Sequence, residues 1–177
     1  MLYHSDQLAP PELPNCDSST ITLNWSQIHQ SAKIGPECVI SEEVSIGPWT
    51  TLVARVTLGF DVTIGENCLL HPGVFVGSHS ILGKSVIIGS LSVLGDGVRI
   101  GESSEIGTGC HFGSNVIIEP DVQIGTGVYL ASGVRVKTGS VIENDVNILR
   151  PGTIPQGSHV RVENRKNASA PRKRWMI

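Results

Sequence analysis

An apolar residue recurs at every sixth position of this chain, and no other feature restricts its fold so strongly. The repeat fills 22 consecutive hexads over residues 28–159 without an insertion. Because only 40% of the chain is hydrophobic, chance would almost never place an apolar residue at all 22 positions. The recurring residues are Ile28, Ile34, Ile40, Ile46, Leu52, Leu58, Ile64, Leu70, Val76, Leu82, Ile88, Leu94, Ile100, Ile106, Phe112, Ile118, Ile124, Leu130, Val136, Ile142, Ile148 and Ile154.

The other hexad positions are patterned as well, when the large apolar residue is numbered position 1. Position 5 is small or β-branched, with 11 Val, 5 Ser, 3 Cys and one each of Ala, Thr and Gly. Position 2 is Gly in 12 of the 22 hexads, and position 4 is Gly, Asn, Asp or His in 13. The residue types at position 4 tolerate a positive φ better than most. Each hexad therefore predicts a short strand followed by a corner, with positions 5 and 1 on the same, inward side.

A period of six does not suit an α-helix, whose 3.6 residues per turn would spread the apolar positions around its surface. An antiparallel arrangement of hairpins would show turn signals at longer spacing. The period instead predicts a coil of short strands, each bonded in parallel to its counterpart in the next coil. The inward side chains would fill the axis of this all-β solenoid and supply its core.

The hexads IHQSAK, IGPECV, IGENCL, IGTGCH and IGTGVY resemble those of the hexapeptide-repeat transferases. The resemblance covers 132 of the 177 residues and implies a left-handed parallel β-helix of about seven coils, with three hexads per coil. It also implies a homotrimer that moves an acyl group to a sugar or amino-acid acceptor. The acyl donor would be a coenzyme A thioester or an acyl carrier protein, acting as co-substrate, and no permanently bound cofactor is expected.

The chain divides into three segments around this repeat. We expect residues 1–27 to form a leader that caps the open end, residues 28–159 the β-helix, and residues 160–177 a basic tail. The tail carries Arg161, Arg165, Lys166, Arg172, Lys173 and Arg174 against the single acid Glu163. A solvated tail is one interpretation. In the other, which the resemblance suggests, Arg165 and Lys166 bind the phosphates of coenzyme A or of a phosphopantetheine arm.

Position 6 of each hexad should point outward, and in the middle coils it is conspicuously apolar. Exposed apolar stripes on a flat prism predict a subunit interface. With 18 residues per coil, the stripes are Phe75, Val93, His111 and Tyr129 on one face, Leu69 and Ile87 on the next, and Ile81 and Ile117 on the third.

The family resemblance implies a histidine as general base, and in several branches it occupies position 3 of a hexad. No hexad of this chain has a histidine there. His111 is the first candidate, because the apolar stripe would place it near a neighbouring subunit. His79, at position 4, is the second, although a corner-forming role alone would also explain it. Asp61 lies one coil earlier and is expected to orient His79, because equivalent atoms of adjacent coils are about 4.8 Å apart.

Two other functions remain open at this point. A γ-carbonic-anhydrase-like metal enzyme needs three converging histidines, and the spacing of the histidines here predicts no metal site. A non-catalytic β-helix scaffold is the stronger alternative, because no loop interrupts the coils to cover an acceptor. Cys38, Cys68 and Cys110 occupy the small inward position and are predicted to be packing residues.

The net charge of -3 gives no reason to expect nucleic-acid binding. The first twenty residues lack the hydrophobic run of a signal peptide, and no stretch approaches the roughly 18 apolar residues of a membrane span. The four cysteines form no CxxC pair. We therefore expect a cytoplasmic protein without membrane insertion.

Overall fold

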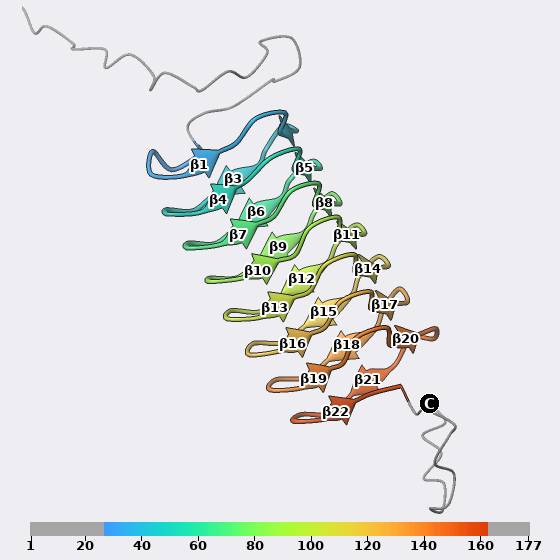
Figure 1. Cartoon of the computed structure of the whole chain (residues 1–177). Coiled ribbons are helices and arrows are strands. Elements are labelled where there is room, and N and C mark those ends of the chain that lie inside the picture. The colour runs from blue at the N-terminus through green and yellow to red at the C-terminus, as the bar shows by residue number, and fades with distance from the viewer. Residues whose placement is uncertain (1–26, 163–177) are drawn as a thin grey trace, which may run out of the picture.

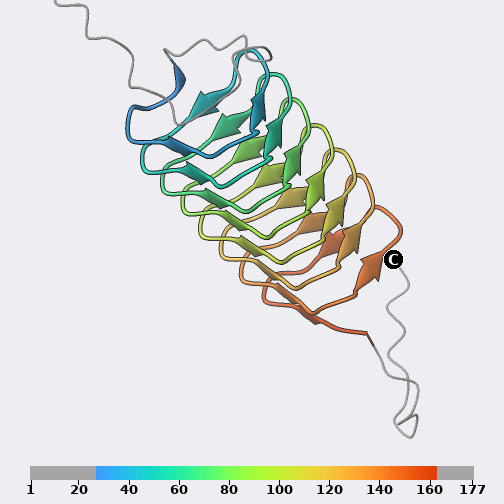
Figure 2. The ribbon, with the colours of Figure 1, turned by 45° about the horizontal axis from the view of Figure 1, so that its top comes forward.

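Short strands stacked along one axis make up the described part of the chain, residues 27–162 of the computed structural model (Figure 1). The 22 strands have two residues each and are joined by corners. Seen from a second direction, the coils form a three-sided prism with one strand on each side per coil (Figure 2). The fold is an all-β, left-handed parallel β-helix of about seven coils, which confirms the predicted fold class.

Three parallel sheets form the sides of the prism, named here faces I, II and III. Face I holds β1 (Lys33–Ile34), β4 (Thr51–Leu52), β7 (Leu69–Leu70), β10 (Ile87–Ile88), β13 (Glu105–Ile106), β16 (Gln123–Ile124), β19 (Val141–Ile142) and β22 (His159–Val160). Face II holds β2 (Val39–Ile40), β5 (Thr57–Leu58), β8 (Phe75–Val76), β11 (Val93–Leu94), β14 (His111–Phe112), β17 (Tyr129–Leu130) and β20 (Asn147–Ile148). Face III holds β3 (Ser45–Ile46), β6 (Thr63–Ile64), β9 (Ile81–Leu82), β12 (Arg99–Ile100), β15 (Ile117–Ile118), β18 (Arg135–Val136) and β21 (Thr153–Ile154).

The register is constant along the solenoid. Each strand pairs in parallel with the strand 18 residues later, as Ile34 pairs with Leu52 and Ile88 with Ile106. Backbone bonds continue through the corners, where the Asp61 amide donates to the Glu42 carbonyl at 3.2 Å. A residue's neighbours along the solenoid are therefore the residues 18 positions before and after it.

Positions 1 and 5 of the hexads build the core, as predicted. Apart from the end positions, the large residues at position 1 are fully buried, with Leu58, Leu70 and Ile88 each 0% exposed. Position 5 also buries five hydroxyl side chains: Thr50, Ser80, Ser92, Ser104 and Ser140. Each donates to a backbone carbonyl 15 residues later, and four of them also accept an amide 18 residues later. No buried side-chain polar atom within residues 27–162 lacks a hydrogen bond. Burying these hydroxyls therefore leaves no unpaired polar group in the core.

The corners depend on a positive φ at position 4. Twenty of the 22 position-4 residues adopt it, the exceptions being Ser31 and Pro151. All 13 Gly, Asn, Asp and His residues at this position do so, which confirms the prediction from their residue types. Seven further residues adopt it although their side chains disfavour it: Glu37, Glu43, Trp49, Arg55, Ser85, Leu91 and Ser103.

Position 6 points outward and places the predicted apolar residues on the predicted faces, but these residues occupy consecutive strands on only two of the three faces. Phe75, Val93, His111 and Tyr129 occupy successive strands of face II. Leu69 and Ile87 are neighbours on face I. On face III, however, Arg99 lies between Ile81 and Ile117, so the apolar stripe expected there is interrupted by a cation.

Within the described residues, no helix is long and apolar enough to cross a membrane. Most of the leader and of the basic tail, including residues 20–25, lies outside the described residues.

Candidate functional site

His79 and Asp61 meet at the corner between faces II and III. His79 follows β8 and Asp61 follows β5, both at position 4 and both with positive φ (59° and 54°). The Nδ1 atom of His79 lies 3.0 Å from Oδ2 of Asp61. Because an ionised carboxylate can only accept, Nδ1 carries the proton of this bond, and in the neutral imidazole Nε2 keeps its lone pair. The His79 side chain is 60% exposed, so an acceptor molecule can reach it from solvent.

The surroundings of His79 hold its ring and its backbone in place. The ring of Phe60 contacts the imidazole edge to face, with centroids 5.7 Å apart and planes at 81°. The Phe60 amide donates to Oγ of Ser78 at 3.2 Å, and the Ser78 amide donates to Oδ1 of Asp96 at 2.8 Å. Three successive coils thus fix the corner that presents the imidazole.

His111 has a different environment, on β14 of face II. Its ring stacks on that of Tyr129, with centroids 5.5 Å apart and planes at 2°. Its side chain makes no hydrogen bond or ion pair with any residue in the range 27–162. His111 therefore lacks an orienting partner of the kind that Asp61 gives to His79.

The structure thus brings two of the predicted catalytic residues together and leaves the third apart. The expected contact between Asp61 and His79 is present, while His111 is two strands from β8, which precedes His79. The catalytic roles of all three stay predictions. Arg165 and Lys166, predicted to bind coenzyme A phosphates, lie outside the described residues.

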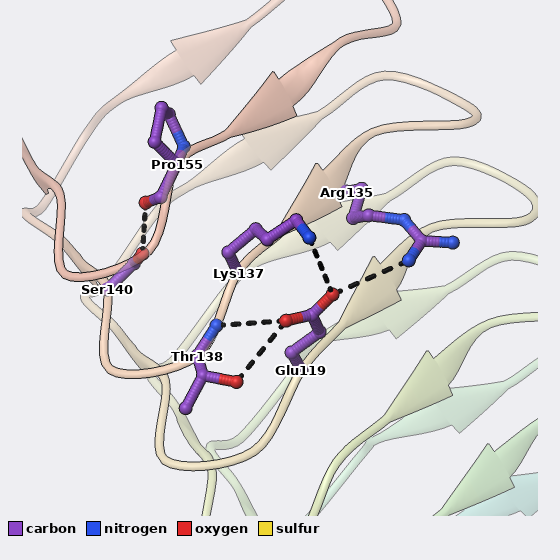
Figure 3. A network of polar contacts seen from close by, with 6 residues as sticks. All are labelled: Glu119, Arg135, Lys137, Thr138, Ser140 and Pro155. Atoms are coloured by element: carbon purple, nitrogen blue, oxygen red, sulfur yellow. Dashed lines mark hydrogen bonds and ion pairs between the residues drawn. The ribbon is translucent and has the colours of Figure 1, made fainter.

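A polar network at the corner between faces III and I was missed by the sequence analysis (Figure 3). The carboxylate of Glu119 accepts from the amide and hydroxyl of Thr138 at 3.3 and 3.2 Å. It also contacts Nη1 of Arg135 at 3.4 Å and Nζ of Lys137 at 3.7 Å. The Thr138 amide lowers the pKa of Glu119, partial desolvation opposes this, and the two cations assist it. A signal was available, because Glu119 and Lys137 replace the usual Gly at position 2 in consecutive coils.

A shallow, open hollow of about 430 Å³ lies on face I toward the C-terminal coils, and we call it the face I hollow. It does not include His79 or His111. The lining residues are Glu105, Gln123, Ile124, Gly125, Val141, Ile142, Glu143 and Asn144.

The inward cysteines pack as predicted. Cys38, Cys68 and Cys110 are buried, and burial raises the pKa of the Cys68 and Cys110 thiols. The Sγ atoms of Cys68 and Cys110 each lie 3.0 Å from a backbone carbonyl. Over residues 27–162, no three His, Cys, Asp or Glu side chains are grouped so that they could hold a metal ion.

Two family models match adjoining parts of the sequence. Residues 20–103 match the GMPPB C-terminal domain, and residues 103–138 match the bacterial transferase hexapeptide, a model of six repeats. No curated protein matches the sequence.

Solved structures with the same fold include two acyl-group transferases. UDP-N-acetylglucosamine acyltransferase from Francisella novicida superposes with a TM-score of 0.63 and 24% identity, over 76% of this chain and 61% of that one. PerB from Caulobacter crescentus, solved with CoA and GDP-perosamine, gives a TM-score of 0.55 and 29% identity, over 59% of this chain and 52% of that one. This chain thus spans less than two thirds of the length of either protein.

Proposed function

Because this chain belongs to the hexapeptide-repeat transferase family, we propose that it is an acyltransferase that uses His79 as its general base. The acyl donor is a coenzyme A thioester or an acyl carrier protein, and the acceptor is a sugar or an amino acid. The observation that carries the proposal is the exposed His79 imidazole, held by Asp61 at 3.0 Å with Nε2 free.

The proposed reaction needs one proton acceptor and no metal. Nε2 of His79 removes a proton from the acceptor amine or hydroxyl while the acceptor's lone pair attacks the thioester carbonyl. The resulting tetrahedral intermediate collapses, the carbon–sulfur bond breaks, and the proton passes from His79 to the departing thiolate. Asp61 is a positioning residue in this scheme, because it fixes the tautomer and orientation of the imidazole.

The geometry favours His79 over His111, which was the first candidate from the sequence. A general base works best when a third group orients it, and of these two histidines only His79 has such a partner among the described residues. His111 is instead part of the apolar stripe on face II, where stacking on Tyr129 suits a packing role. We retain His111 as the alternative base.

The substrate class is supported by the relatives. PerB was solved with CoA and GDP-perosamine, and the Francisella novicida protein is a UDP-N-acetylglucosamine acyltransferase. A sugar attached to a nucleotide is therefore the first acceptor class to test. Arg165 and Lys166 are proposed to bind phosphates of the donor.

We propose a cytoplasmic homotrimer as the working form. Exposed apolar side chains on the described faces, such as Phe75 (42% exposed) and Ile87 (36%), support association of copies. A neighbouring copy would also supply a wall beside His79, whose side chain is 60% exposed. Sedimentation equilibrium of the full chain checks the stoichiometry, and a monomer at micromolar concentration contradicts this part of the proposal.

The test of activity compares two matched histidine variants. Thiol release from acetyl-coenzyme A is followed with a panel of amino sugars, nucleotide sugars and amino acids. His79→Gln should lower kcat by about 10²–10⁴-fold with the best acceptor, while His111→Gln should keep more than half of it. Loss of activity in His111→Gln alone would transfer the role of base to His111.

A scaffold without catalytic activity is the second candidate, favoured by the 22 hexads that run without an interrupting loop. The two functions differ in their binding of the donor. Coenzyme A at millimolar concentration should raise the melting temperature of an acyltransferase by mass action. No shift, together with no thiol release from any acceptor, would support the scaffold.

A further inference from the structure

We propose that the face I hollow is the docking site of the chain's own basic segment, residues 163–177. The proposal concerns a surface that does not include His79, and it uses the same segment whose Arg165 and Lys166 are proposed to bind the donor phosphates. It rests on the charge of the hollow, on the contrast with the other two faces, and on the point where the described chain leaves the solenoid.

The hollow and the segment carry opposite charges. Residues 163–177 contain five Lys or Arg side chains and one acid, Glu163. Glu105 and Glu143 line the hollow, and both are exposed. Glu105 makes no side-chain hydrogen bond or ion pair with residues 27–162, so its carboxylate is available to a cation. Glu143 shares one oxygen with Nε2 of His159 at 2.8 Å.

The charged side chains around the hollow are mostly acidic. Asp145 follows Glu143 at the same corner, and Arg161 follows β22, the strand at the hollow's rim. The other faces suit a basic segment less well. Face III presents Arg99 and Arg135 at its outward positions. The outward positions of face II hold no Asp or Glu: they are Val39, Thr57, Phe75, Val93, His111, Tyr129 and Asn147.

The chain leaves the solenoid beside the hollow. The Val160 carbonyl of β22 accepts the Glu143 amide at 2.8 Å, so the last strand lies against the hollow's rim. Glu105 is three strands from β22, or about 15 Å at the usual strand spacing. The 13 residues from Val162 to Trp175 span up to about 43 Å when extended, which leaves ample slack. Trp175 would add apolar contact with the half-buried Val141.

Disulfide trapping in the full chain tests the proposal. Gln123→Cys, in the hollow, is combined with Trp175→Cys in a Cys16→Ser background. The remaining cysteines, Cys38, Cys68 and Cys110, are buried and should not react. The control pair is Thr153→Cys with Trp175→Cys, because Thr153 is an exposed residue of β21 on face III, in the last full coil. Docking should make the Gln123 pair cross-link about tenfold faster than the control pair.

Charge removal supplies the second readout. Glu105→Gln together with Glu143→Gln should reduce the advantage of the Gln123 pair by about three- to tenfold, and salt at 0.5 M should do the same. If the double variant folds poorly, Glu105→Gln alone should also reduce the rate advantage of the Gln123 pair. This variant should fold, because the Glu105 side chain has no partner among the described residues to lose. Equal rates for the two pairs, an advantage that survives both substitutions, or disulfides that join two chains would each overturn the proposal.

Discussion

The side chain of Leu91 lies over Gly73 of the preceding coil, so that a Cβ atom at residue 73 would come within 2.9 Å of Leu91 Cδ2. Both residues occupy position 4 at the corner between faces I and II, and both have a positive φ. Leu91 is 68% exposed, so burial does little to offset the strain of its backbone conformation. The corner therefore holds a bulky residue where glycine or asparagine would cost less.

Replacing Leu91 with asparagine should stabilise the protein. Asparagine tolerates the left-handed conformation, and the substitution exposes little apolar surface that is not exposed already. We expect the free energy of unfolding to rise by about 0.5–1 kcal/mol, measured by urea denaturation. Ile87→Asn, on the neighbouring strand of face I, is the matched control and should not stabilise. A lower stability for Leu91→Asn would show that the leucine makes a contact within the protein that outweighs the strain.

Substitution at the inward position 1 should reduce the stability of the protein far more than substitution at the outward position 6 beside it. Ile100 is 2% exposed, and its neighbour Arg99 on the same strand is exposed. Ile100→Ala removes buried methyl groups and leaves a cavity, so it should cost about 2–5 kcal/mol. Arg99→Ala should change the stability by less than about 0.5 kcal/mol. Equal costs for the two variants in chemical denaturation would contradict the assignment of inward and outward positions.

Glu119 should make the stability of the protein depend on acid pH. Its pKa is lowered in the folded state, chiefly by the Thr138 amide, so the folded protein favours the charged form more than the unfolded chain does. The resulting stabilisation is present above the ordinary carboxyl pKa and is lost as the pH falls through the lowered one. Glu119→Gln should therefore lower the melting temperature at pH 7 and shrink the difference between pH 7 and pH 3. A melting temperature that falls equally at both pH values would assign the effect to packing.

The sequence predicts most of this fold because each residue's neighbours follow from simple arithmetic. The period of six assigns every side chain to the core, a corner or the outside, and the 18-residue coil that the family resemblance implies aligns Asp61 with His79. The same arithmetic aligns Glu119 with Lys137, but their contact also depends on rotamers and on Thr138 between the faces. Residue propensities fail at Trp49 and Leu91, because the closed coil imposes a positive φ that their side chains disfavour.

The candidate site is less predictable than the fold for a physical reason. A sequence pattern gives the direction of each side chain, whereas a pocket depends on the relative sizes of side chains in several coils. The six-residue repeat therefore does not predict the face I hollow, which is lined by residues of β16 and β19 among others. The choice of general base also depends on a contact. The sequence alone favours His111, whereas the contact between Asp61 and His79 in the structure supports His79.

Asp61 should affect catalysis through His79 without contacting the substrate. Asp61→Ala removes the acceptor of the Nδ1 proton, so the imidazole can rotate and exchange tautomers. We expect kcat to fall by at least about tenfold while KM changes less than twofold, with His79→Gln as the lower limit of activity. The exposed pair contributes at most about 1 kcal/mol to stability, so the melting temperature should hardly move.

Nitrogen-15 NMR of the His79 ring gives a readout that packing would not affect. Wild type should show one predominant tautomer protonated at Nδ1, and Asp61→Ala a mixture. An unchanged tautomer together with unchanged kcat would mean that Asp61 does not position His79.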